Sequence, residues 1–143
     1  MVKQRFEKLF SVEEANQLIP RLENLIAQIQ TRANQLREHV EQLAEKRGEE
    51  QPEYNDFDEV VKQHPELREI GEDIGVLVGE IHSYGCILKD IDLGLVDFPH
   101  EMEHETVFLC WQFGEPTIAA WHTIDTGFGA RRPLAGAPKR FLN

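Results

Sequence analysis

The sequence predicts an α+β fold: an antiparallel helical hairpin followed by a small antiparallel sheet of three or four strands. The hairpin is predicted because apolar residues recur at alternating spacings of three and four between residues 19 and 43, and again between residues 67 and 84. The sheet is predicted because short runs rich in β-branched and aromatic residues, divided by turn signals, follow residue 85. We expect one domain over residues 1–143, which is enough chain for a core of its own.

The first helix has a clear start signal. Ser11 and Glu14 have the spacing of a capping box, in which each side chain bonds the backbone N–H of the other residue, so the helix begins at about Val12. Pro20 lacks a backbone donor and is disfavoured inside a helix. We therefore expect a short helix that ends near Ile19, and a new helix with Pro20 in its first turn.

Two heptad-like seams predict the hairpin. The first seam has the apolar residues Ile19, Leu22, Ile26, Ile29, Ala33, Leu36, Val40 and Leu43, and the second has Leu67, Ile70, Ile74, Leu77, Ile81 and Tyr84. A loop over residues 48–57 joins them, Pro65 opens the second helix and Gly85 closes it. The first seam spans about 25 residues and the second about 18. A partner chain in a homodimer is the simplest way to bury the extra length of the first seam. The sequence does not distinguish this dimer from a monomer whose hairpin packs on its own sheet.

Gly71, Gly75 and Gly79 form a bare stripe beside the second seam. Each costs a helix roughly 1 kcal/mol relative to alanine, so we expect the stripe to allow close packing on the sheet or on a dimer mate.

The sheet is predicted from four runs, at residues 86–89, 93–98, 106–113 and 117–123, with a turn at 114–116. The tail from Gly127 onward contains many Gly, Pro and Arg residues, and we expect no regular structure there.

Charge and hydropathy exclude several classes of partner. The formal net charge is −11, which argues against nucleic acid or an anionic membrane as the main partner. The basic residues Arg131, Arg132, Lys139 and Arg140 are expected to form a solvated tail. The chain has neither a membrane-length apolar run nor a signal-peptide pattern, so we expect a cytoplasmic protein with reduced cysteines.

Three segments resemble a known bacterial family. These are FSVEEANQLIP at residues 10–20, DIDLGLVDFP at 90–99 and LCWQFGEPTIAAWHTIDTGFGARRPL at 109–134. Together they resemble the family catalogued as domain of unknown function 2203. The resemblance implies a complete single domain in a prokaryotic cytoplasm and a hairpin tip near residues 99–105. It implies no activity and assigns no catalytic or ligand residue.

Residues 100–104 match the HExxH motif, in which two histidines on one helical face bind zinc. Here His100 and His104 follow Pro99 between two strand-like runs, which leaves too little room for a stable helix. The sequence favours an exposed acidic hairpin loop.

A thiol–imidazole zinc site is a second candidate, formed by His82, Cys86, Cys110 and His122. A five-residue loop between the last strands would pair Cys110 with His122, whereas a four-residue loop would place them on opposite faces. Alternatively, the cysteines are buried small apolar residues and His82 lies at a helix C-terminus, where a positive charge is favourable.

A small-molecule pocket is a third candidate, with the lining residues Trp111, Trp121, His122, Asp125, Phe128 and Arg131. His122 and Asp125 could hydrogen-bond, and Arg131 could bind a carboxylate or phosphate. Alternatively, the tryptophans are core and interface anchors and Arg131 bridges surface acids.

The leading hypothesis is a non-enzymatic cytoplasmic module that dimerises through its hairpin and presents residues 111–132 to a partner protein or small ligand. The alternative is a metal-binding protein or small metal-dependent hydrolase. No cofactor is predicted, with zinc as the one candidate, and the sequence does not decide whether the protein is an enzyme.

Overall fold

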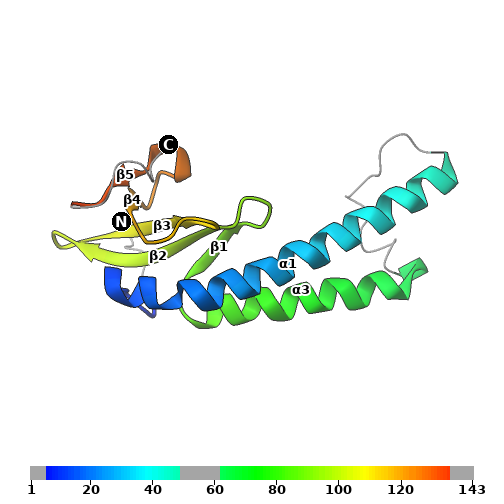
Figure 1. The fold of residues 1–143 in the computed structure, drawn as a ribbon, viewed down its shortest axis with the longest axis horizontal. Coiled ribbons are helices and arrows are strands. Elements are labelled where there is room, and N and C mark those ends of the chain that lie inside the picture. The colour runs from blue at the N-terminus through cyan, green and yellow to red at the C-terminus, as the bar shows by residue number, and fades with distance from the viewer. Residues whose placement is uncertain (1–5, 49–61, 136–143) are drawn as a thin grey trace.

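The computed structural model describes residues 6–48 and 62–135 and has the predicted α+β fold (Figure 1). Two helices, α1 (Val12–Arg47) and α3 (Pro65–Ser83), lie side by side as a hairpin. They precede the strands β1 (Ile87–Asp90), β2 (Leu95–Met102), β3 (Glu105–Gln112), β4 (Ala120–Thr123) and β5 (Arg132–Pro133). The strands form one antiparallel sheet in chain order, so the described sheet has five strands and not three or four.

Helix α1 begins with the predicted capping box. The Ser11 hydroxyl accepts from the Glu14 N–H at 3.0 Å, and the Glu14 carboxylate accepts from the Ser11 N–H at 2.9 Å. The predicted break at Pro20 is wrong, because the helix continues through it. An interior proline costs a helix about 3 kcal/mol, whereas each fully buried aliphatic side chain contributes about 1.5–3 kcal/mol. Ile19 and Leu22 on either side of Pro20 are both buried, so packing outweighs the lost hydrogen bond.

The other helix ends follow the predicted signals. Gly48 caps α1 in the left-handed conformation, Pro65 opens α3, and Gly85 follows α3 with φ of 98°. Residues 49–57 of the predicted loop lie outside the described residues.

The sheet covers the N-terminal half of α1 (Figure 1). The core between them includes Ala15, Ile19, Leu22, Leu25, Ile26, Ile29, Val96, Phe98, Leu109, Trp111 and Ile118. The excess length of the first seam is therefore covered by the protein's own sheet. Seam length alone gives no reason to expect a dimer.

The glycine stripe does not pack on the sheet, contrary to one of the two expectations. A Cβ placed on Gly75 or Gly79 would meet no atom within 4 Å, and Val76 between them is 72% exposed. This face of α3 is uncovered in the described structure, and packing on a second copy stays a prediction.

The two faces of the sheet have different roles because side chains alternate along each strand. Pairing of Val96 with Trp111 and of Phe98 with Leu109 directs these four residues toward the helices, where they are buried in the core. The opposite face, called the outer face below, carries alternate residues of the same strands, and the candidate site lies there.

The C-terminal segment is more regular than predicted. Residues 128–130 form a 3-10 helix, and the short strand β5 pairs with β4. The Leu134 N–H donates to the Ala119 carbonyl at 2.9 Å. This hydrogen bond holds the segment against the residue that precedes β4. Within residues 6–48 and 62–135, no helix is both long and apolar enough to cross a membrane.

Candidate functional site

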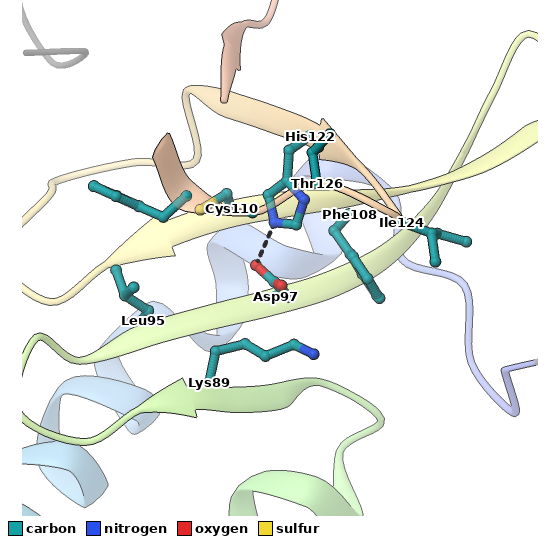
Figure 2. A pocket seen from close by; sticks show the side chains of 10 residues that line it. Lys89, Leu95, Asp97, Phe108, Cys110, His122, Ile124 and Thr126 are labelled. Carbon is teal, nitrogen blue, oxygen red and sulfur yellow. Dashed lines mark hydrogen bonds and ion pairs between the residues drawn. The ribbon is translucent and has the colours of Figure 1, made fainter. Parts of the chain in front are cut away.

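Three buried polar side chains meet on the outer face of the sheet (Figure 2). Asp97 comes from β2, Cys110 from β3 and His122 from β4, and they are 3%, 1% and 3% exposed. Asp97 pairs directly with Cys110, while His122 lies opposite Phe108, two residues earlier on β3. The pairing therefore places all three side chains on one face.

The hydrogen bonds of His122 fix its tautomer. Its Nδ1 lies 2.8 Å from the Thr123 carbonyl oxygen, which can only accept, so Nδ1 carries a hydrogen. Its Nε2 lies 3.0 Å from Asp97 Oδ1. A hydrogen bond there needs one more proton, held either by the carboxyl or by Nε2. Asp97 and His122 thus share one proton in a buried pair.

Burial favours the protonated forms of Asp97 and Cys110. It raises the pKa of Asp97, and the His122 interaction and the positive charge of Lys89 offset this only in part. Burial, together with the Asp97 charge, raises the pKa of Cys110 to about 12. Cys110 is therefore a neutral thiol at neutral pH. This disfavours a thiolate nucleophile, because cysteine catalysis needs a lowered pKa.

The same three residues can hold a metal ion. Asp97, Cys110 and His122 offer one oxygen, one sulfur and one nitrogen atom, and these atoms all lie within 4.8 Å of one another. They form the only such group of three or more among the described residues. The hydrogen bond from Nδ1 to Thr123 leaves Nε2 as the ligand atom, and metal-binding histidines are usually oriented by a bond of this kind.

A pocket of about 240 Å³ opens over the three residues. Its ten lining residues are Lys89, Leu95, Asp97, Phe108, Cys110, His122, Ile124, Thr126, Gly127 and Phe128. Most of its wall is apolar. Lys89 lies on the β1 side of Asp97, with its ammonium 5.6 Å from the centroid of the Phe108 ring (Figure 2).

Of the six residues predicted to line a ligand pocket, only His122 and Phe128 line this one. Trp111 faces the helices, is fully buried and donates from Nε1 to the Glu115 carbonyl at 2.9 Å. Trp121 also packs against the core, with Arg132 stacked on it. Asp125 is exposed, and the carboxyl partner of His122 is Asp97 in its place.

Arg131 is held by Glu115. Its Nη1 donates to both carboxylate oxygens at 3.0 and 2.9 Å, and its guanidinium lies over the Phe128 ring at 4.3 Å. Both side chains of this ion pair are mostly buried. Arg131 thus anchors the segment that forms one wall of the pocket, and it bridges a buried acid, where the sequence suggested a surface acid.

The predicted four-residue zinc set is divided between two places. Cys110 and His122 lie on one face of the sheet, as the site needed, but Cys110 pairs with Ala120, which is neither of the predicted registers. His82 and Cys86 lie at the junction of α3 and β1 and line a separate pocket. Cys86 Sγ donates to the Ile81 carbonyl at 3.3 Å, and burial raises its pKa to about 12.

The HExxH segment forms a hairpin. His100 lies on β2 and donates from Nδ1 to the Phe10 carbonyl at 2.6 Å, while His104 is exposed in the turn with φ of 68°. The helical geometry that a zinc peptidase needs is therefore not present in these residues.

Asp97 is the site residue that the sequence reasoning missed. It had a signal, since it is the one charged residue in the apolar run 93–98, which was predicted to be a strand. A carboxyl at such a position must find a buried partner.

A family model described as "uncharacterized conserved protein (DUF2203)" matches residues 8–134. The chain belongs to this family. The match includes all three residues of the site and both residues of the Glu115–Arg131 ion pair. The DUF2203 description assigns no activity. Comparisons with curated proteins and with solved structures gave no match.

Proposed function

We propose that this protein binds a divalent transition metal, with zinc as the best fit, through Asp97, Cys110 and His122. The carrying observation is that three ligand atoms of different chemistry lie within 4.8 Å of one another on three adjacent strands. Rigid strands suit a metal site because they hold the ligands with little freedom.

The ligand set selects among metals. Nitrogen and thiolate sulfur favour zinc over magnesium or calcium, and zinc accepts a carboxylate oxygen as a third ligand. Ligand atoms in a tetrahedral zinc site are about 3–4 Å apart, so binding requires only a small contraction. Asp97 and His122 already meet this spacing at 3.0 Å.

Three protein ligands would leave a fourth position open, and the pocket lined by these residues would give an outside ligand access to it. Zinc sites with an exchangeable fourth position activate water or bind substrates, whereas structural sites are closed by a fourth protein ligand. A metal-dependent hydrolase is therefore the enzyme class to test once metal binding is established. As part of the same proposal, we place the protein in the bacterial cytoplasm, where Cys110 stays reduced.

Cobalt(II) titration tests the proposal, because cobalt reports thiolate coordination by colour. We expect a 1:1 complex with visible bands of a tetrahedral site and a near-ultraviolet sulfur-to-cobalt band. Cys110→Ser should abolish the sulfur band, whereas Cys86→Ser, which alters the other buried cysteine, should leave it unchanged. Equal spectra for both variants, or no complex, would refute the proposed site.

Self-association through α3 is a second candidate function, favoured by the open face of that helix. Val76 is 72% exposed between Gly75 and Gly79, where added side chains would meet no atom within 4 Å. This surface has a projection and two gaps one helical turn apart, so it is complementary to itself under a two-fold axis. Light scattering should give a dimer mass for the wild type and a monomer mass for Val76→Glu. A wild type that stays monomeric at high concentration would exclude self-association through α3.

A further inference from the structure

We propose that the group which completes the metal site is a small monoanion with an apolar body, such as a short-chain carboxylate, whose charge is balanced by Lys89. This inference rests on the proposed metal site and names the class of ligand that the site would take.

The charges around the pocket lead to a monoanion. A divalent metal with Asp97 as carboxylate, Cys110 as thiolate and His122 as neutral imidazole has a net charge of zero. Lys89 adds one positive charge, and apart from the metal-binding groups it is the only charged side chain among the described residues that line the pocket. Arg131 does not change this sum, because Glu115 neutralises it. Lys89 is itself exposed, so its charge lies at the edge of the pocket. One anionic ligand on the metal would bring the sum of these charges to zero.

Lys89 is placed to act on such a ligand. It lies on β1 beside the Asp97 carboxyl, and its positive charge acts on that group. Its ammonium is held 5.6 Å from the centre of the Phe108 ring, which itself lines the pocket. Because this ammonium is exposed, water screens part of its attraction for an anion in the pocket.

The rest of the wall fits an apolar body. Leu95, Phe108, Ile124 and Phe128 present aliphatic and aromatic surface around the volume of about 240 Å³. Such a pocket holds a group of a few carbon atoms, and apolar walls with a few polar groups at one end are typical of small-molecule sites. The ligand's acid group would face the metal and its carbon chain would face these walls.

The probes are acetate, propionate and butyrate, with butyramide as the neutral counterpart of butyrate. Each is titrated into the cobalt-loaded protein while the visible bands are followed. We expect butyrate to bind at least tenfold more tightly than butyramide. We also expect affinity to rise by about fourfold for each added methylene, because each buries apolar surface.

Lys89→Met tests the residue itself. The matched control is Lys62→Met, which changes an exposed lysine three residues before α3. The first change should weaken butyrate about threefold without weakening cobalt, because an exposed ion pair contributes little, and the second should alter neither. Failure to bind cobalt overturns the metal proposal. If cobalt binds, equal affinity for butyrate and butyramide, no gain with chain length, or no effect of Lys89→Met overturns the anion inference alone.

Discussion

His122 Nε2 lies 3.0 Å from Asp97 Oδ1, while its Nδ1–H is committed to the Thr123 carbonyl. The two side chains therefore share a single proton in a site where both are almost fully buried. A metal ion that replaced this proton would find the imidazole already in the required tautomer and orientation. The pair thus connects the stability of the fold with the chemistry of the site.

Loss of either partner should have unequal effects on stability. His122→Ala leaves the Asp97 carboxyl buried without its partner, and we expect a loss of about 3 kcal/mol in the free energy of unfolding. Asp97→Asn keeps a donor for Nε2 in the same volume, so it should cost about 1 kcal/mol or less. Urea unfolding of the metal-free proteins measures both. Equal losses would contradict the prediction that an amide at position 97 replaces the carboxyl as the partner of Nε2.

The raised pKa of Asp97 predicts a pH dependence. Because the folded protein holds this proton more tightly than the unfolded chain, the contribution of Asp97 is fully present below the unfolded pKa of about 3.9. It is lost as pH rises from there through the folded pKa. The stability of the wild type relative to Asp97→Asn should therefore fall over this range. A difference that rises with pH would contradict the raised pKa of Asp97.

Both cysteines should resist alkylation in the folded, metal-free protein. Burial raises the pKa of Cys86 and of Cys110 to about 12, so almost no thiolate is present at pH 8. We expect iodoacetamide to react at least a hundredfold more slowly than in urea, as followed by mass spectrometry. Fast modification of Cys110 with Cys86 protected would mean that the pocket exposes the thiol, and would contradict its burial beside Asp97.

The sequence predicted the helices well because local periodicity determines them. The exception at Pro20 arose because burial of Ile19 and Leu22 outweighs one missing hydrogen bond, and this depends on the sheet, not on the helix. The C-terminal 3-10 helix and β5 were missed for a similar reason, since pairing with β4 orders a segment whose composition favours irregular structure.

The site was harder to predict because it depends on register across three strands. The sequence indicated Cys110 and His122 as candidate ligands. Their relative position depends on the path of residues 113–119 between the two strands. That path includes a tertiary contact, in which the Ile118 N–H donates to Asn16 Oδ1 of α1 at 2.8 Å. No local pattern contains this contact. Asp97 could have been found from its charge within a buried strand, but its partner could not.

Two glycines give opposite predictions that test the fold. A Cβ on Gly94, which has φ of +67°, would lie 2.5 Å from Phe113 Cβ, so Gly94→Ala should cost more than about 2 kcal/mol. A Cβ on Gly79 would meet nothing within 4 Å in a helix, so Gly79→Ala should stabilise the monomer by about 1 kcal/mol. The unfolding midpoints of the two variants, each compared with that of the wild type, test both predictions. Stabilisation by Gly94→Ala would contradict the close approach of the β1–β2 turn to Phe113.

The central claim is that Asp97, Cys110 and His122 form a metal site, and proton release on zinc binding tests it most directly. Zinc must displace the proton shared by Asp97 and His122 and the proton of the Cys110 thiol. Calorimetric titrations at pH 7 in buffers of different ionisation enthalpy should give one zinc per chain and about two protons released. Cys110→Ser should weaken binding and release about one proton. Zinc binding without proton release, or unchanged binding in this variant, would contradict a metal site at these three residues.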